Sequence, residues 1–435
     1  MDRTRFRKLG FSDLHPLKKV QADFLDLVNI KGDIELVHPR DAFHRYLAKT
    51  VTVKLPVPPY DKSAMDGYAI QARDSFGANV RNPKIVRLVD AIAIEEKRDL
   101  KVQQGTAIKV ATGAMVPEGA DAVIKIEDTE FEKERNQLKL YNPVVPGKNI
   151  MKQGEDYRQG DTLLDRGRSQ LPQDVGALVT VGYRRVPVIA NPKVTIIATG
   201  NELIDIDEVD DDGSEIELDK VYDGGMVNSN QFAIGSFVRL AGGEVIDAFT
   251  IKDDEQTIKG VFNQSLINSD MVITTGGTSV GEKDLMPVVM DSDHEILYHG
   301  IAVRPGSATL VGFGIEKPVV CLSGFPVAAE IGMLYLAMPA IRKMAGARLL
   351  DPRVLLPARI STAVPKKGFG ITRMLRVKLD YDQIDENGLP AAHSVKLSGS
   401  SMQRSMIESD GFVEIPPESE GLEKGDIVKV RLHYN

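Results

Sequence analysis

The chain has 435 residues, of which 42% are hydrophobic and 27% charged, so it can form several domains with sizeable cores. Its 54 basic and 62 acidic side chains give a net charge of −8, and the absence of a broad basic block argues against nucleic acid as a main partner. A single cysteine, Cys321, excludes an intramolecular disulfide framework, and no apolar run is long enough to predict a membrane segment or a secretory leader.

The first 50 residues favour helices. Residues 16–29 place Val20, Phe24 and Val28 on one face at helical spacing. Residues 39–50 begin with proline and resemble a second short helix. From residue 51 to about 186, short apolar runs rich in β-branched residues alternate with Gly, Pro and Asp turns, which predicts a mostly β region.

Between residues 192 and 346 the pattern becomes β-α-β. Strands are predicted at 193–199, 244–251, 271–275 and 318–322, and helices at 229–241 (capped by Asn228 or Ser229), 253–269 and 326–344. Such alternation predicts a parallel sheet with helices on both faces, and sites in these folds lie at the carboxyl ends of the strands.

The acidic excess belongs to one stretch of this region. Residues 201–220 hold ten carboxylates and one lysine, and the other 415 residues are almost neutral. The stretch is either a solvated loop or a lid or docking element beside a site. A loop of this charge repels anionic substrates at low salt unless it recruits cations or moves away.

The last part of the chain returns to a β pattern. Strand candidates lie at 354–360, 374–379, 411–415 and 426–432, separated by turn residues. A small C-terminal barrel or sandwich is expected.

Three predicted strand ends lead into turns of small residues: ATGNEL (198–203), TTGGTSVGEKD (274–284) and LSGFP (322–326). Glycines allow close approach of a ligand, and free N–H groups at turns bind anionic oxygens. The turns therefore predict an anion cradle. The alternative is a set of tight strand-to-helix turns with acids that only stabilise a helix start.

Other segments leave two interpretations open. Arg304 in RPGSATL (304–310) is either an oxyanion clamp or a solvated hairpin residue. The loops PPYDKSAMDGYAI (58–70) and GEDYRQGD (154–161) are either functional or plain turns. Cys321 is expected in the core, and His299 is expected to be structural.

Taken in order, these motifs resemble one family. SAMDGYA, TGAMVPEGADAVIKIED, NIMKQGED, PKVTIIATGNEL, MVNSN and ITTGGTSVGEKD are similar to the motifs of the molybdopterin molybdotransferases, which include MoeA proteins and the E domain of gephyrin. The resemblance spans about residues 15–435.

The resemblance implies an enzyme of molybdenum cofactor assembly. In this family adenylylated molybdopterin is hydrolysed, AMP leaves, and molybdate is inserted with the help of Mg²⁺. The family also implies a homodimer with its site between the β-α-β domain of one subunit and the β-rich domain of the other. The single cysteine favours a reducing, cytoplasmic setting.

It further implies a multidomain fold, α/β plus β, with a doubly wound molybdopterin-binding domain, a β-rich N-terminal part and a small C-terminal β barrel. The expected parts are an N-terminal helix (14–33), a linker domain (34–52 and 148–187), a β-rich domain (53–147), the β-α-β domain (188–346) and the barrel (347–435).

Site residues carry over by motif position. The catalytic candidates are Asp66, Thr112, Asp156 and Glu202. The substrate-binding candidates are Gly276, Gly277, Ser279, Arg304, Ser323 and Arg376. The Mg²⁺ candidates are Glu202, Asp253 and Asp284, because Mg²⁺ prefers hard oxygen ligands.

Two segments depart from the family pattern. The family's I-K-P-G-K-P becomes VRPGSA here, so Ser307 stands where a second cation is expected, and L-P-G-N-P becomes LSGFP with Phe325 in place of an amide. Phe325 either packs or alters the site. These changes leave two alternatives to the molybdate insertase: a tungstate-preferring paralogue and a molybdopterin-binding scaffold. The acidic stretch within residues 204–222 is also an apparent insertion relative to the family.

Overall fold

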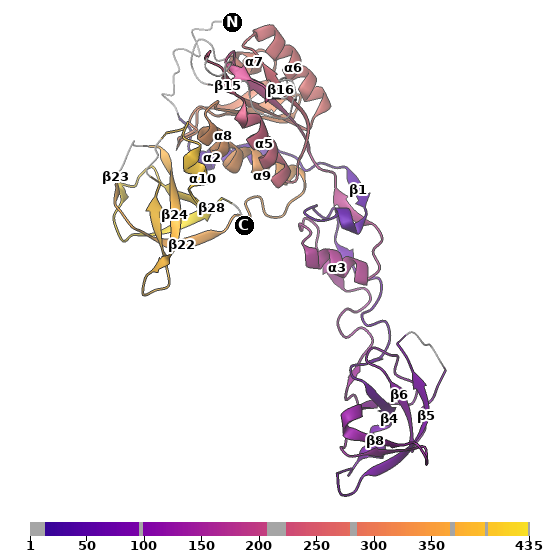
Figure 1. Cartoon of the computed structure of the whole chain (residues 1–435). Helices are drawn as coiled ribbons and strands as arrows, with labels where there is room; N and C mark the ends of the chain where they lie inside the picture. The colour runs from indigo at the N-terminus through magenta and orange to yellow at the C-terminus, as the bar shows by residue number, and fades with distance from the viewer. Residues whose placement is uncertain are drawn as a thin grey trace.

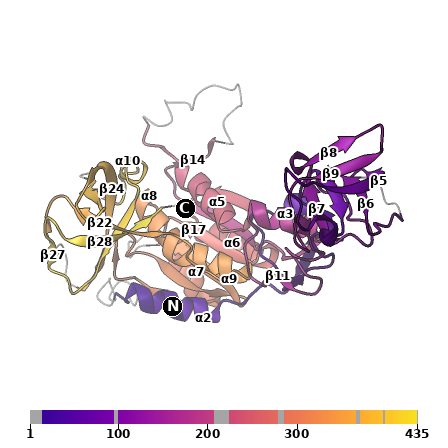
Figure 2. The ribbon, with the colours of Figure 1, turned by 90° about the horizontal axis from the view of Figure 1, so that it is seen from below.

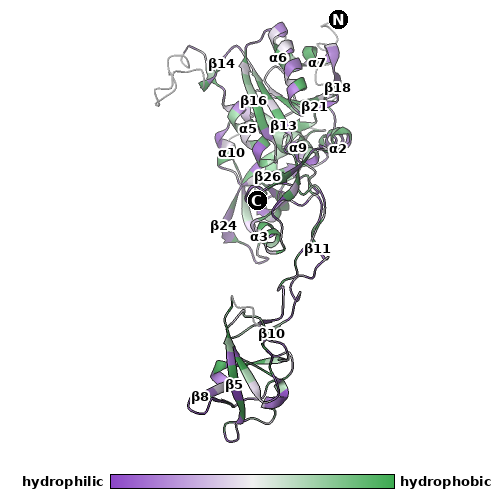
Figure 3. Cartoon of the chain, turned by 90° about the vertical axis from the view of Figure 1, so that its right-hand side faces the viewer, coloured by the Kyte–Doolittle hydropathy of each residue, from purple (hydrophilic) through white to green (hydrophobic). Residues whose placement is uncertain are grey.

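The computed structural model describes residues 14–94, 99–206, 223–278, 285–365, 370–395 and 399–433. A head (14–33 and 190–433) and a β-rich domain (54–156) lie at opposite ends of an elongated chain (Figures 1 and 3). A narrow linker (34–53 and 157–189) joins them, and the chain passes along it twice. None of the helices in these ranges is long and apolar enough to cross a membrane.

A six-stranded sheet with the order β16-β13-β17-β21-β20-β18 forms the centre of the head. Its strands are β13 (Lys193–Thr199), β16 (Glu244–Ile251), β17 (Met271–Thr275), β18 (Glu295–His299), β20 (Leu310–Gly314) and β21 (Lys317–Leu322). The four predicted strands are present and parallel, with bounds that agree within one residue. Their apolar runs are buried because helices cover both sides of the sheet.

The parallel sheet carries two further strands, not predicted from the sequence, that are antiparallel at one edge. β20 is antiparallel to β21, and β18 is antiparallel to β20. Only Ile315 and Glu316, with φ of 51° and 63°, connect β20 to β21. A connection this short returns the chain in the opposite direction, whereas a parallel pair needs a long crossover.

Helices cover both faces of this sheet (Figure 2). One face carries α2 (Leu17–Leu27), α5 (Ser229–Leu240) and a continuous helix made of α8 (Pro326–Gly332), a π-helical turn (Met333–Ala337) and α9 (Met338–Met344). The other face carries α6 (Glu255–Asn268) and α7 (Met286–Asp293). Neighbouring residues of β13 face opposite ways: Ile196 packs in the first core and Ile197 in the second. Green, hydrophobic residues accordingly run along the central strands (Figure 3).

The linker consists of short pairings between the outgoing and returning chain. Its elements are β1 (Ile34–Val37) paired with β12 (Val186–Ile189), β2 (Val51–Thr52) paired with β11 (Thr162–Leu164), and α3 (Pro172–Thr180). α3 is an exception to the predicted β character of residues 51–186.

The helix predicted at residues 39–50 was wrong. Only Pro39–Asp41 form a 3-10 turn, and His44 has a φ of 60°. Leu47 bridges to Val188, and the Ala48 N–H donates to the Pro187 carbonyl (3.0 Å). Because these backbone groups bond to the returning strand, a helix over the same residues would leave the linker unpaired.

The β-rich domain is built on a six-stranded sheet with the order β7-β4-β6-β5-β9-β8. Its strands are β3 (Lys62–Ser63), β4 (Gly67–Ile70), β5 (Lys84–Ile92), β6 (Thr106–Val110), β7 (Ala122–Lys125), β8 (Thr129–Glu132), β9 (Gln137–Leu140) and β10 (Ile150–Met151). The β3–β10 pair stands outside this sheet, at the side of the linker.

The C-terminal part is a barrel rather than a sandwich. The strands β22 (Leu355–Ile360), β24 (Thr372–Ile384), β25 (Pro390–Ser394), β26 (Gly411–Ile415) and β28 (Ile427–Leu432) close because β24 pairs with both β25 and β26. β19 (Val303–Arg304) of the head adds to β24. The remaining elements are β23 (Val364–Pro365), β27 (Gly421–Leu422) and α10 (Arg404–Ile407). The predicted fold class is confirmed.

The acidic stretch lies mostly outside the described residues. β14 (Leu203–Ile204) and β15 (Met226–Val227) pair in parallel and bracket residues 207–222. The choice between a solvated loop and a lid stays open. Cys321 is buried as predicted, and burial raises the pKa of its thiol to about 12.

Candidate functional site

The three turns of small residues lie side by side at the carboxyl ends of β13, β17 and β21. The Gly276 N–H donates to the Leu322 carbonyl (3.1 Å). The Asn230 amide, on α5, donates to the Thr275 hydroxyl (3.0 Å) and to the Gly324 carbonyl (2.9 Å). The turn after β17 is thereby fixed against the turn after β21.

Close approach explains the glycines after β17. Gly276 has a φ of 92°, and a Cβ there would lie 2.2 Å from the Thr199 carbonyl oxygen. At Gly277, a Cβ would lie 3.1 Å from the Thr199 hydroxyl, which is buried and has no hydrogen-bond partner among the described residues. Backbone and hydroxyl groups therefore gather at one point, as the anion-cradle interpretation requires. Ser279, also predicted to belong here, lies outside the described residues.

A cavity of about 400 Å³ lies beside these turns, between the head sheet and the barrel; we call it the strand-end cavity. It is lined by Arg304, Pro305, Gly306, Ser307, Ala308, Ser323, Phe325, Ala328, Arg373, Met374, Leu375, Arg376, Val395, Gly399 and Ser400. The pairing of β19 with β24 sets Arg304 opposite Arg373. The Val327 N–H donates to the Ser400 carbonyl (3.0 Å), which holds the start of α8 against the barrel loop.

The charge of the strand-end cavity is positive. Neither Arg304 nor Arg373 has a carboxylate within ion-pair distance in the described part of the chain. Burial lowers the pKa of Arg373 and of Arg376, and Arg373 lowers that of Arg376 further. Burial raises the pKa of Glu330, on α8, to about 7, against the opposing effect of Arg376. A tetrahedral oxyanion would relieve this excess of positive charge, and serine hydroxyls could donate to its oxygens.

Glu202 and Asp253 follow neighbouring parallel strands, β13 and β16. The Asn201 N–H donates to the Asp253 carboxylate (3.3 Å), and the Asp253 N–H donates to the Asn201 side chain (3.1 Å). The Glu202 carboxylate bends back over Gly200, where an added Cβ would be 2.7 Å away. Two carboxylates thus stand at one edge of the sheet. Asp284 lies outside the described residues.

Asp66 and Thr112 form a pair in the β-rich domain. The Asp66 Oδ1 accepts from the Thr112 N–H (2.7 Å) and hydroxyl (2.8 Å), and these bonds lower the pKa of Asp66. Asp156 is exposed near the linker, and its N–H donates to the Val57 carbonyl (2.9 Å). Within one chain this domain stands at the opposite end from the head (Figure 1), so the predicted acids are not brought together.

The sequence prediction missed part of the strand-end cavity. Arg373 and Ser400 were not among the candidates, although Arg304, Ser323 and Arg376 were. Arg373 and Arg376 flank the apolar pair Met374-Leu375 inside a strand, so charged residues in a buried run were a usable signal. Ser400 comes from a loop that no pattern connects to the site.

Comparison with known proteins covers most of the chain. A model described as the MoeA N-terminal region (domain I and II) matches residues 15–182, a probable molybdopterin binding domain matches residues 195–343, and the MoeA C-terminal region (domain IV) matches residues 358–432. The chain is 31% identical to a putative molybdopterin biosynthesis protein of Methanocaldococcus jannaschii over 97% of this chain and 98% of that protein. It is 31% identical to the molybdopterin molybdenumtransferase of Bacillus subtilis over 92% of this chain and 90% of that protein.

A solved structure is also similar. The molybdopterin biosynthesis moeA protein from Pyrococcus horikoshii superposes with a TM-score of 0.80 at 31% identity, over 97% of this chain and 100% of that one. The match therefore includes the head, the linker and the β-rich domain.

Proposed function

Since this chain belongs to the MoeA family, we propose that it inserts molybdate into adenylylated molybdopterin, with Mg²⁺ required and AMP released. The chain is a molybdopterin molybdotransferase and acts in molybdenum cofactor biosynthesis. What we propose beyond this activity is that the substrate is adenylylated, that Mg²⁺ is required and that AMP is released.

The strand-end cavity is the observation that carries the proposal. Arg304, Arg373 and Arg376 converge there from two domains, and Ser323 and Ser400 add hydroxyls. Molybdate is a tetrahedral dianion, so the guanidinium groups of Arg304 and Arg373, which have no carboxylate within ion-pair distance among the described residues, suit it. The glycine turn at Gly276 lies next to this cavity and would take a phosphate of the substrate.

Glu202 and Asp253 fit a magnesium ion by their chemistry. Mg²⁺ is commonly held by one or two carboxylates together with substrate phosphates, and these two side chains stand at the ends of adjacent strands. The described residues contain no cluster of three or more ligating side chains, which agrees with a site completed by substrate. A bound Mg²⁺ would neutralise phosphate charge during hydrolysis.

The Asp66–Thr112 pair would act on the other side of the substrate. Its two hydrogen bonds hold the Asp66 carboxylate in place and keep it ionised. A carboxylate of low pKa is a poor general base, so its role would be to orient the attacking water. Because Asp66 and Glu202 lie at opposite ends of one chain, we propose a homodimer in which each site combines Glu202 of one copy with Asp66 of the other.

The direct test incubates the purified chain with adenylylated molybdopterin, molybdate and Mg²⁺. We expect AMP release coupled to cofactor formation, measured by reconstitution of a molybdenum enzyme that lacks its cofactor. Omission of Mg²⁺ and omission of molybdate are the controls. Tight binding of molybdopterin without AMP release would instead identify a scaffold.

A mixing experiment tests the shared site. Asp66→Ala and Glu202→Ala should each abolish turnover as pure proteins. After co-expression of the two variants, a site shared across a two-fold axis restores about a quarter of the wild-type activity, because half of the dimers contain one intact site of two. Full activity of either pure variant would contradict the assigned roles, and no recovery in the mixture would contradict the shared site.

A second candidate, preference for tungstate, rests on two residues of the same cavity. Ser307 and Phe325 line it, and both depart from the family pattern. Loss of one cation and gain of a ring alter how an oxyanion is held. The same assay with tungstate in place of molybdate separates the two candidates by their relative kcat/KM.

A further inference from the structure

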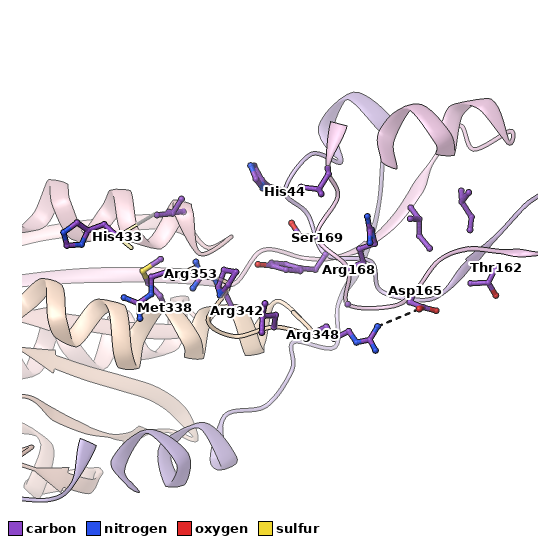
Figure 4. A pocket seen from close by; sticks show the side chains of 18 residues that line it. His44, Thr162, Asp165, Arg168, Ser169, Met338, Arg342, Arg348, Arg353 and His433 are labelled. Atoms are coloured by element: carbon purple, nitrogen blue, oxygen red, sulfur yellow. Dashed lines mark ion pairs between the residues drawn. The ribbon is translucent and has the colours of Figure 1, made fainter. Parts of the chain in front are cut away.

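A second and larger cavity, of about 710 Å³, lies where the linker meets α9 and the barrel; we call it the junction cavity (Figure 4). It shares no lining residue with the strand-end cavity. Its lining comprises His44, Tyr46, Thr162, Leu163, Leu164, Asp165, Gly167, Arg168, Ser169, Leu171, Leu240, Met338, Arg342, Arg348, Leu349, Pro352, Arg353 and His433. Four of these are arginines: Arg168 comes from the linker, and Arg342, Arg348 and Arg353 come from one stretch at and after α9.

Two of the four arginines have strong carboxylate partners. Arg168 forms two bonds with Asp174 (2.9 Å each). Arg353 holds both oxygens of Asp351 (2.8 and 2.9 Å), and Arg431 takes the same carboxylate at 3.0 Å. Asp351 therefore already serves two guanidinium groups.

Arg342 differs from the other three lining arginines. It is only 5% exposed, donates to the Leu350 carbonyl (3.2 Å) and bonds to the Tyr46 hydroxyl. No carboxylate of the described residues lies within ion-pair distance of it. Burial lowers its pKa, against the effects of Tyr46 and Asp351. A buried cation without a counter-charge is costly, so the position calls for an anion.

Other groups that line the junction cavity also favour a bound anion. Nη1 of Arg353 is buried and has no acceptor in the described structure. Arg348 is 77% exposed in its side chain and reaches Asp165 only at 3.8 Å, the ion pair dashed in Figure 4. Burial lowers the pKa of His433 to about 4, so it is neutral near pH 7 and adds no charge.

We propose that the junction cavity binds a small phosphate-bearing molecule, with the phosphate at Arg342 and Arg348. A phosphate offers oxygens to the guanidinium fork and supplies the missing negative charge. The organic part would lie along the apolar wall formed by Leu163, Leu164, Leu171, Leu240, Met338, Leu349 and Pro352. The cavity volume exceeds that of a free phosphate, and this wall favours a phosphomonoester over inorganic phosphate.

The test measures binding of inorganic phosphate and of phenyl phosphate to the full-length protein by calorimetry, at constant ionic strength. We expect Arg342→Gln to weaken phenyl phosphate binding at least tenfold. Arg135→Gln, an exposed arginine of the β-rich domain, is the matched control. Unchanged binding by Arg342→Gln would overturn the proposal. Equal affinity for the two probes would overturn the assignment of the apolar wall.

Stability separates a binding role from a structural one. If Arg342 is an uncompensated charge, Arg342→Gln unfolds at the same or a higher temperature than the wild type without phosphate, and loses the upward shift that phenyl phosphate gives. A lower melting temperature with a retained shift would show that Arg342 only supports the fold and would overturn the proposal.

A measurement on the wild type needs no variant. Phenyl phosphate should protect Arg348, the exposed arginine of the proposed phosphate site, from phenylglyoxal, mapped by mass spectrometry, while Arg135 stays reactive. Lack of protection would overturn the proposal, as would a carboxylate of a second copy seated on Arg342 in a structure of the assembled protein.

Discussion

The molecule has two arginine-lined cavities that treat charge differently. In the strand-end cavity Arg304 and Arg373 have no carboxylate partner among the described residues, and the nearby acid, Glu330, is a partly buried group whose pKa is raised. In the junction cavity Arg168 is tied to Asp174, Arg353 to Asp351 and Arg348 to Asp165, and Arg342 has no carboxylate of the described residues within ion-pair distance. The number of arginines that line each cavity therefore does not show which cavity has positive charge available for a ligand.

The difference shows which arginines are available for a ligand. A guanidinium that already holds a carboxylate mainly stabilises the fold, and its loss exposes a buried partner. A guanidinium without a partner raises the energy of the empty site and lowers that of the loaded one. The strand-end cavity is therefore built mainly for binding, and the junction cavity mainly for connecting domains.

Removal of a carboxylate should distinguish the cavities most strongly. Asp351→Asn leaves Arg353 and Arg431 with weakened partners in a buried place, so we expect a loss of about 3–5 kcal/mol in unfolding free energy. Urea unfolding measures it. Asp165→Asn, whose ion pair with Arg348 is exposed, is the control and should cost at most about 0.5 kcal/mol. Similar losses of unfolding free energy in both variants would contradict the distinction between the buried and the exposed ion pair.

Removal of arginines from the strand-end cavity should have the opposite effect, with activity lost and stability kept. The double variant Arg304→Gln/Arg373→Gln should reduce kcat/KM for molybdate about 100-fold, from two charge-assisted contacts of about 1.5 kcal/mol each. Folding stability should not fall, because neither Arg304 nor Arg373 holds a carboxylate of the described residues. Arg342→Gln is the control and should turn over molybdate like the wild type. An equal loss of activity in Arg342→Gln would show that both cavities serve the same reaction.

Glu330 provides a pH test of the strand-end cavity. Burial raises its pKa from 4.5 to about 7, so the folded protein holds a proton that the unfolded chain has lost. Stability from this group therefore falls as pH rises from about 4.5 to 7. Glu330→Gln removes this pH dependence. The unfolding free energy of the variant should therefore exceed that of the wild type by at most roughly 3 kcal/mol at pH 8.

Unfolding in urea at pH 5 and pH 8 measures this difference. Asp351 has a pKa shifted in the opposite direction, because Arg353 and Arg431 outweigh its burial, so its contribution is lost only in acid. Parallel stability curves for the wild type and Glu330→Gln would contradict the expectation.

Phe325 offers the mildest test. Its side chain is 56% exposed while lining the strand-end cavity, so it does not pack in the core. We expect Phe325→Ala to weaken molybdopterin binding by about 1 kcal/mol, the usual gain from ring stacking, with unchanged stability. Phe76→Ala, of similar exposure in the β-rich domain, should do neither. A melting temperature lowered only in Phe325→Ala would show that the ring packs after all.

The parts of the fold that could be predicted from sequence were those set by local pattern. β13, β16 and β17 have the predicted bounds, and α5 begins after Asn228, whose side chain accepts from the Gln231 N–H. Strong apolar runs and a capping side chain determine the secondary structure of such segments locally. The stretch at 39–50 was misjudged because its backbone partners, Pro187 and Val188, lie about 140 residues away.

The sequence by itself determined the family, the kinds of elements and the chemical nature of the candidate residues, because motifs and periodicity are local properties. Tertiary structure alone decided which arginines meet and which are neutralised. Arg304 meets Arg373 through the β19–β24 register, and Asp351 bonds directly to Arg353 and Arg431 while it acts on Arg342 only from beyond ion-pair distance. Compensation of charge depends on distances between segments far apart in the chain, and no spacing along the sequence encodes those distances directly.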